Sequence, residues 1–174
     1  GVLHSGTGNM AALTPDEMIP QMQTRVCRLH GKNDLRIETM EIASPAEGEV
    51  LVAVAAGGIC GSDLHYLSDG GIGTIRVREP IILGHEASGR VEAIGPGVTG
   101  LAPGDGVAIN PSRPCGRCRY CSENLPMHCL SMRFNGSAMR LPHEQGFFRD
   151  RIVVSADQCI KVPESADMHA VACA

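Results

Sequence analysis

Four cysteines in the second half of the chain are spaced as ligands of one metal ion. Cys115, Cys118, Cys121 and Cys129 follow the pattern C-x2-C-x2-C-x7-C. Thiolates are soft, strongly donating ligands, and four of them close a tetrahedral shell around Zn²⁺. The short gaps let one turn present three sulfurs to a common centre, and the longer gap lets the chain circle the ion. The spacing therefore predicts a structural zinc lobe at residues 110–135, with no open position for catalysis.

Three other interpretations of these cysteines stay open on spacing alone. Disulfides are disfavoured because cysteines three apart in a tight turn rarely bridge each other. A redox C-x-x-C motif has two cysteines rather than three in series. An iron–sulfur cluster is the third alternative, because the run vaguely resembles a ferredoxin spacing. Arg113, Arg117 and Arg119 lie among the cysteines, and we expect them to compensate the excess negative charge of the thiolates.

A second group of possible ligands comes earlier in the chain. Cys60 and the pair His85-Glu86 each follow an apolar run of strand length. They offer sulfur, nitrogen and oxygen, and three protein ligands with a fourth position left for water or substrate are typical of a catalytic zinc. Taken singly, a lone cysteine after a strand is more often a small core residue. A lone histidine is likewise more often a hydrogen-bonded group than a ligand, so the residues alone leave both interpretations open.

Composition and charge limit the class of protein. The chain has 174 residues, 43% of them hydrophobic and 20% charged, which is typical of a globular domain with a core of its own. The net charge of −4 argues against a general nucleic-acid binder. The sequence contains no run of eighteen apolar residues of the kind that would predict a membrane span. Cysteines kept reduced for metal imply the cytoplasm, and residues 1–21 are expected to be a disordered tail or an unrelated N-terminal extension.

Short apolar runs between turn residues predict a mainly β domain over residues 22–174. The expected strands are 24–29 and 35–42 around a turn at 31–34, then 49–56, 87–95, 106–110, 147–155 and 158–162. Short turns without long alternating helices favour a barrel or sandwich over a doubly wound sheet. A helix is expected from Ala166, capped by Pro163-Glu164-Ser165. No stop signal follows this helix, so we expect the chain to be part of a longer protein.

The only G-x-G-x-x-G pattern, Gly95 to Gly100, is not a nucleotide-binding loop. It contains Pro96, and residues 101–105 cannot open a helix. The pattern instead predicts a turn between two strands, so no cofactor-binding residue is assigned in this chain.

Four motifs occur together in one order: Cys60-Gly-Ser-Asp-x-His65, Gly84-His85-Glu86, Gly104-Asp-x-Val107 and the four-cysteine lobe. From about Val26 onward the chain resembles the zinc-dependent medium-chain dehydrogenase/reductase family. Residues 110–116, 132–139 and 141–143 are most similar to its polyol and sugar-acid dehydrogenases. The sorbitol, xylitol and threonine dehydrogenases share the metal motifs but not all of these stretches.

The resemblance implies a GroES-like β-barrel catalytic domain with a few short helices, whose Rossmann domain is absent from this chain. It implies oxidation of a secondary alcohol of a small polyol or sugar acid to a ketone, with NAD or NADP in the full-length protein, one structural and one catalytic Zn²⁺, and a homo-oligomer. The chain alone is then expected to be inactive.

The same resemblance implies roles for residues near the second group of ligands. Cys60, His85 and Glu86 hold the catalytic zinc, with Glu86 ligating directly or alternating with water, and a further glutamate is expected beyond Ala174. Ser62 accepts the substrate proton and passes it through the cofactor ribose to His65. Asp63 orients His85 or stabilises the N-terminus of a short turn at residues 64–67, and both can hold.

Weaker expectations concern the surroundings. Tyr66 and Phe134 line the substrate pocket. Arg113 meets a sugar-acid carboxylate or balances the thiolates, and we favour the second. The remaining cysteines, Cys27, Cys159 and Cys173, are interpreted as small buried residues. His128 is not expected to be a metal ligand.

Two functions from other classes compete with the enzyme. One is a zinc-held interaction module that docks through the four-cysteine lobe, and the other is a thiol redox protein. The motifs around Cys60 and His85 have no purpose under the first of these.

Overall fold

The structure is a computed structural model that describes residues 22–174, so the tail predicted at 1–21 lies outside the described residues. Its first strands, β1 (Met22–Gly31) and β2 (Asp34–Ile42), pair antiparallel across a tight turn. Asn33 takes the left-handed conformation in this turn, with φ of 58°, which asparagine tolerates better than most residues. The short strand β6 (Ile81–Ile82) pairs with the other edge of β1. The hairpin predicted from the sequence is confirmed.

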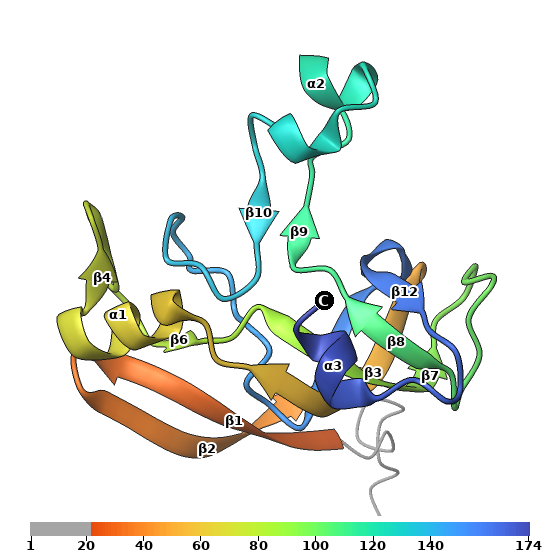
Figure 1. The fold of residues 1–174 in the computed structure, drawn as a ribbon, viewed down its shortest axis with the longest axis horizontal. Helices are drawn as coiled ribbons and strands as arrows, with labels where there is room; N and C mark the ends of the chain where they lie inside the picture. Colours follow the sequence, from red (N-terminus) through yellow and green to blue (C-terminus); the bar gives the residue numbers. More distant parts are fainter. Residues whose placement is uncertain (1–21) are drawn as a thin grey trace, which may run out of the picture.

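Five antiparallel strands form the central sheet, in the order β11-β3-β7-β8-β12. They are β3 (Glu49–Gly58), β7 (Glu86–Ile94), β8 (Gly106–Ile109), β11 (Arg151–Ser155) and β12 (Cys159–Lys161). The pairing of β3 with β7 is interrupted by two register shifts, and such bulges bend a sheet. Figure 1 shows this sheet beside the β1–β2 hairpin, with α3 packed over β3 and β7.

One strand is shorter than the sequence predicts, and the next is confirmed. The strand expected at 147–155 begins only at Arg151, because the backbone N–H groups of Phe147 and Phe148 donate instead to the carbonyls of Gly84 and Leu83. The expected strand at 158–162 is confirmed as β12, preceded by the 3-10 helix η3 (Ala156–Gln158).

The helices are short. They are α1 (Gly61–Asp69), α2 (Arg119–Ser122), α3 (Met168–Ala172) and the 3-10 helix η2 (Pro126–His128). The turn expected at 64–67 is therefore part of a nine-residue helix. The helix expected from Ala166 begins at Met168, and its cap is Asp167, which accepts a hydrogen bond from the backbone N–H of His169 at 2.9 Å. Within residues 22–174, no helix is long and apolar enough to cross a membrane.

Two further strand pairs complete the fold. The first is β4 (Gly71–Ile72) with β5 (Ile75–Arg76), and the second is β9 (Ser112–Arg113) with β10 (Arg133–Phe134). In Figure 1, β9 and β10 form a stalk that carries the segment between them away from the barrel.

Alternating apolar residues of the central sheet make the main core. Phe147, 1% exposed, packs there against Val50, Val52, Val91 and Val107. A second cluster joins the hairpin to α1 through Leu29, Tyr66, Ile81 and Leu83. The Gly95–Gly100 pattern is a turn between β7 and β8, and a Cβ on Gly95 would clash with the carbonyl of Ala46. The mainly β fold with few short helices is confirmed.

Candidate metal centres

The sheet itself brings Cys60, His85 and Glu86 together. Gly58 at the end of β3 pairs with Glu86 at the start of β7, so Cys60, two residues later, lies beside the segment that carries the other two ligands. One donor atom from each of the three residues lies within 4.8 Å of the others. A Cβ on Gly58 would clash with the Glu86 carboxylate, so glycine at this position leaves room for that side chain.

The donor set fits zinc. Ligands bound at about 2.0–2.3 Å in a tetrahedral shell lie on the order of 3.5 Å from one another. A set already within 4.8 Å therefore needs side-chain adjustments of about 1 Å to share an ion. One sulfur, one imidazole nitrogen and one carboxylate oxygen leave a fourth position open.

Asp63 ties the backbone segments of these ligands together. Its side chain is 3% exposed. Oδ2 accepts a hydrogen bond from the backbone N–H of Cys60 at 3.0 Å, and Oδ1 accepts one from Gly84 at 3.1 Å. The distance from Oδ1 to Nδ1 of His85 is 3.9 Å, too long for a hydrogen bond. Asp63 thus holds the chain on either side of the site. It also lies in the first turn of α1, where an acidic side chain was predicted to stabilise the N-terminus, but it makes no hydrogen bond to His85.

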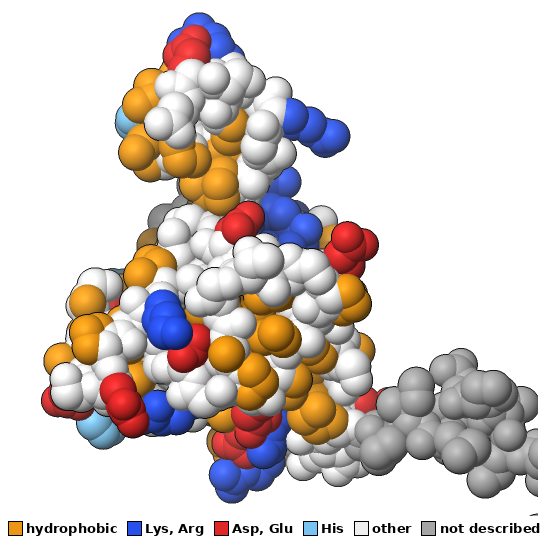
Figure 2. Space-filling view, turned by 90° about the vertical axis from the view of Figure 1, so that its right-hand side faces the viewer, with side chains coloured by type: hydrophobic (Ala, Val, Ile, Leu, Met, Phe, Trp, Pro, Cys, Tyr) orange, Lys and Arg blue, Asp and Glu red, His pale blue; other side chains and the backbone are white. Residues whose placement is uncertain are grey.

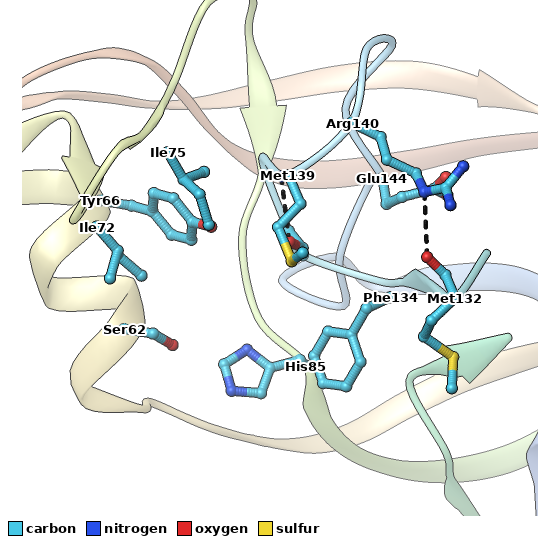
Figure 3. Close-up of a pocket in the computed structure, with 12 residues that line it drawn as sticks. Ser62, Tyr66, Ile72, Ile75, His85, Met132, Phe134, Met139, Arg140 and Glu144 are labelled. Atoms are coloured by element: carbon cyan, nitrogen blue, oxygen red, sulfur yellow. Dashed lines mark hydrogen bonds between the residues drawn. The ribbon is translucent and has the colours of Figure 1, made fainter. Parts of the chain in front are cut away.

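A cavity of about 360 Å³ opens against His85. Figure 3 shows Ser62 on α1 and the ring of Phe134 facing His85, and the two ring centroids lie 5.6 Å apart. Tyr66 also lines the cavity, and its hydroxyl accepts a hydrogen bond from the backbone N–H of Ala138 at 3.2 Å. The predicted lining by Tyr66 and Phe134 is therefore present. The remaining wall is largely apolar and comes from Ile72, Ile75, Met132 and Met139.

His65 lies outside this cavity. Its side chain is 63% exposed, and Nδ1 lies 3.0 Å from the Asp69 carboxylate one turn along α1. The structure therefore places Ser62 at the cavity and His65 at the solvent side of the same helix.

The four sulfurs of the lobe also converge. The Sγ atom of Cys118 lies 3.5 Å from that of Cys121 and 3.9 Å from that of Cys129, and all four sulfurs lie within 4.8 Å of one another. These distances match the edge of about 3.8 Å expected for a tetrahedral zinc with bonds of about 2.3 Å. All of these cysteines are free of disulfides.

Hydrogen bonds and desolvation shift the pKa values of the lobe thiols in opposite directions. Backbone N–H groups of Cys121 and Leu130 donate toward the Cys118 sulfur and lower its pKa to about 6. The pKa of Cys115 is lowered too, chiefly by the backbone N–H of Arg117. Partial desolvation raises the pKa of Cys121 to about 11. A metal must therefore displace a proton from Cys121 at neutral pH, whereas Cys118 is already largely thiolate.

No side chain from Pro114 to Ser131 is buried. Figure 2 shows the lobe as a separate projection with hydrophobic side chains on its surface. Among them, Met127 is 67% and Leu130 is 71% exposed. Because the lobe has no apolar core, the four sulfurs are the only part of it that converges on a common centre.

Arg113 corrects one prediction, and the correction reveals a residue that the sequence reasoning missed. Its guanidinium does not face the thiolates but lies 3.7 Å from the carboxylate of Glu144. Arg133, its partner across the β9–β10 pair, binds the same carboxylate at 2.5 Å. Glu144 is 7% exposed and lines the cavity beside His85. The stalk of the lobe is thereby fixed to the cavity wall. The contact of Glu144 with the two arginines depends on the pairing of distant segments, which the sequence pattern does not reveal.

The other cysteines follow the prediction in part. Cys27 and Cys159 are half-buried, and burial raises the pKa of Cys159 to about 11. Cys173 is exposed near the end of the chain, so its predicted burial is wrong. Only two clusters of metal-binding donors occur in residues 22–174, and both were predicted.

A β-barrel that carries one sealed four-cysteine centre and one open Cys-His-Glu centre defines a domain of the zinc-dependent alcohol dehydrogenase type. Residues 46–164 match the alcohol dehydrogenase GroES-like domain, and the chain belongs to this family.

Relatives with assigned activities are of the same kind. The chain is 42% identical over 152 residues to L-idonate 5-dehydrogenase (NAD(P)(+)) of Escherichia coli. The matched region covers 87% of this chain and 43% of the relative. The chain is 37% identical over 147 residues to sorbitol dehydrogenase of Bacillus subtilis, covering 84% and 40%. The crystal structure of the E. coli L-idonate 5-dehydrogenase matches with a TM-score of 0.76 and 40% identity, over 84% of this chain and 42% of that one. The chain thus spans less than half the length of these relatives.

Proposed function

We propose that this chain is the metal-carrying part of an NAD(P)-dependent dehydrogenase that oxidises a secondary alcohol of a polyol or sugar acid to a ketone. One observation carries the proposal: the donors of Cys60, His85 and Glu86 converge within 4.8 Å beside a cavity wide enough for a small sugar. The similarity to L-idonate 5-dehydrogenase supports a substrate of that kind. The alternatives are a sorbitol or xylitol dehydrogenase, which the similarity to sorbitol dehydrogenase and D-xylulose reductase A supports, or a threonine dehydrogenase.

The chemistry divides between the ion and the chain. When bound, zinc supplies a Lewis acid that stabilises the alkoxide form of the substrate hydroxyl. The side chain of Ser62 lines the cavity and can both accept and donate a proton, so we assign it to receive the hydroxyl proton. The imidazole of His65 can accept and donate a proton and is solvent-exposed, so we assign it to exchange protons with water.

The other residues position and enclose the substrate. Asp63 fixes the backbone on either side of the ligands through its bonds to Cys60 and Gly84. Phe134 and the apolar wall cover one side of the cavity with carbon atoms, which reduces the contact of a bound substrate with water. The four-cysteine lobe has a structural role. The reduced thiols support a cytoplasmic location, and a homo-oligomer stays a prediction that size-exclusion chromatography with light scattering can test.

Metal analysis and an activity assay test the proposal. The 174-residue protein, purified without chelator, should hold two zinc ions per chain, and Cys60→Ser should hold one. The complete protein that carries this chain should reduce NAD⁺ or NADP⁺ with L-idonate, sorbitol or xylitol, and Cys60→Ser should abolish that rate. A single zinc in both proteins, with no polyol oxidation, would favour an interaction module. Absence of zinc together with intramolecular disulfides would favour a thiol redox protein.

A further inference from the structure

A second, smaller cavity adjoins the one beside His85. It has a volume of about 260 Å³ and is formed by the β5 strand, the segment that follows it and the loop around residue 140. Ile75, Met139 and Arg140 line both cavities. A molecule that lies in the larger cavity can therefore reach the smaller one past Arg140, which Figure 3 shows at the side of the larger cavity away from Ser62.

The smaller cavity is lined by cations without a matching anion. Arg76, Arg78 and Arg140 all contribute to its wall, and no aspartate or glutamate does. Among residues 22–174, none of these three arginines pairs with a carboxylate, whereas seven others do: Arg25, Arg28, Arg36, Arg113, Arg119, Arg133 and Arg151.

The partners that the three arginines do have are neutral. Nη1 of Arg76 donates to the carbonyls of Gly73 and Ile75, and Nε of Arg140 donates to the carbonyl of Met132 at 3.1 Å. Most of the donor groups of these guanidiniums, five on each, are thus free to bind a ligand. The nearby carboxylate of Glu79 binds the backbone N–H of His143 rather than a guanidinium, so it leaves the three arginines without an ion pair in the described part of the chain.

A buried histidine fixes the two segments that carry this charge. His143 is 4% exposed. Its Nε2 accepts a hydrogen bond from the backbone N–H of Arg78 at 3.0 Å, and its Nδ1 lies 2.6 Å from the carbonyl of Arg140. These two bonds require the neutral ring with the proton on Nδ1. His143 therefore fixes the backbone of Arg78 relative to that of Arg140, while the arginine side chains themselves are exposed and accessible to a ligand.

We propose that Arg76, Arg78 and Arg140 form an anion-binding subsite for the carboxylate or phosphate end of an open-chain sugar. The reacting hydroxyl of that sugar then faces Cys60, His85 and Glu86, a part of the inference that rests on the proposed function. Guanidinium groups bind carboxylate and phosphate oxygens through paired, charge-assisted hydrogen bonds. A neutral polyol gains none of these bonds, so the subsite selects an acid or a sugar phosphate.

Direct titration of the zinc-loaded 174-residue protein tests the subsite. The probes are inorganic phosphate, D-gluconate and neutral sorbitol, followed by NMR or calorimetry at low salt. Arg78→Gln and Arg140→Gln should each weaken the binding of both anions by about tenfold, since each removes a charge-assisted contact. Sorbitol binding should not change in Arg78→Gln, because Arg78 lines only the smaller cavity. Tighter binding of phosphate than of gluconate would assign the subsite to sugar phosphates, and the reverse order would assign it to sugar acids.

Two further variants separate the subsite from other causes. Arg90→Gln is the matched control, because Arg90 is also exposed and donates to a backbone carbonyl, that of Gly104 at 3.1 Å, but lines neither cavity. It should bind the anions as the unmodified protein does. Cys60→Ser removes a ligand of the metal and should keep its affinity for phosphate. Loss of phosphate binding in Cys60→Ser, with full binding in the arginine variants, would show that the metal holds the anion and would overturn the subsite.

The two proposals can fail separately. Equal anion binding by Arg78→Gln, Arg140→Gln and Arg90→Gln would overturn the subsite, even if the complete protein oxidises sorbitol. Arginine-dependent anion binding by a protein that oxidises no polyol or sugar acid would support the subsite and overturn the dehydrogenase.

Discussion

Replacing Cys118 by serine should open the four-cysteine lobe and leave the barrel folded. The Cys118 sulfur lies 3.5 Å from that of Cys121 and 3.9 Å from that of Cys129. A serine hydroxyl is a much poorer zinc ligand than a thiolate, so the substitution should abolish high-affinity binding at this centre.

The structure gives the size of the effect. A structural zinc contributes on the order of 10 kcal/mol to the folding of the segment it holds, which corresponds to a factor of about 10⁷ in the opening equilibrium at 1.4 kcal/mol per tenfold. The lobe has no buried side chain to offset this loss. Its helices, α2 and η2, have four and three residues and are too short to persist alone. Neither core cluster contains a residue between 114 and 131, so the barrel should lose little stability.

Limited proteolysis reads out this difference. Trypsin cleaves after arginine, and Arg117 and Arg119 lie within the lobe. Cleavage at these sites should become rapid in Cys118→Ser and in the chelator-treated protein, while circular dichroism of the barrel changes little. Cys173→Ser, which removes an exposed thiol outside both metal clusters, should behave like the unmodified protein. A Cys118→Ser protein that resists trypsin would refute the reasoning, because the lobe would then be held by contacts other than the metal.

Three further results are expected. Asp63→Asn keeps one acceptor oxygen but turns an NH₂ group toward one of the two backbone N–H groups that Asp63 now binds, so zinc affinity at the Cys60 site should fall by about tenfold to hundredfold in a chelator competition. Asp69→Asn, which changes an exposed side chain, should not alter it. Zinc affinity of the lobe should rise with pH, because partial desolvation raises the pKa of the Cys121 thiol to about 11 and the metal must displace that proton; a pH-independent affinity between pH 6 and about 8 would contradict this. Tyr66→Phe leaves the buried N–H of Ala138 without its partner and should lower the free energy of unfolding in urea by about 1–3 kcal/mol; an unchanged value would show that another acceptor takes over the bond.

Local patterns predicted most strands and the four-cysteine cluster, for a physical reason, whereas the set of Cys60, His85 and Glu86 followed only from the family resemblance. The strands 49–56 and 106–110 alternate or run apolar over their own length, and the cysteines from 115 to 129 need only a short loop to converge. The expected strand at 147–155 was partly wrong because Phe147 and Phe148 are apolar in either environment, and only their partners, Gly84 and Leu83, decide the pairing.

Interactions between distant segments were beyond sequence reasoning. The carboxylate that pairs with Arg113 belongs to Glu144, on a loop beyond the whole lobe. Likewise, His143 binds the backbone of Arg78, 65 residues away in the chain. Each of these residues looks like an ordinary surface charge when read alone, because its function depends on which loop the barrel places beside it.

The two donor clusters differ in what holds their residues together, and this difference should decide how each would bind a metal. At the open cluster, the pairing of Gly58 with Glu86 and the bonds of Asp63 hold the backbone through contacts of the protein itself. Little of the binding free energy is then spent on folding, so an ion can leave and return without unfolding the domain. At the sealed centre the reverse holds, since the lobe has no core apart from its sulfurs and metal binding there is coupled to folding. Mild chelation that removes only the weaker ion should therefore empty the Cys60 site first and leave the lobe resistant to trypsin.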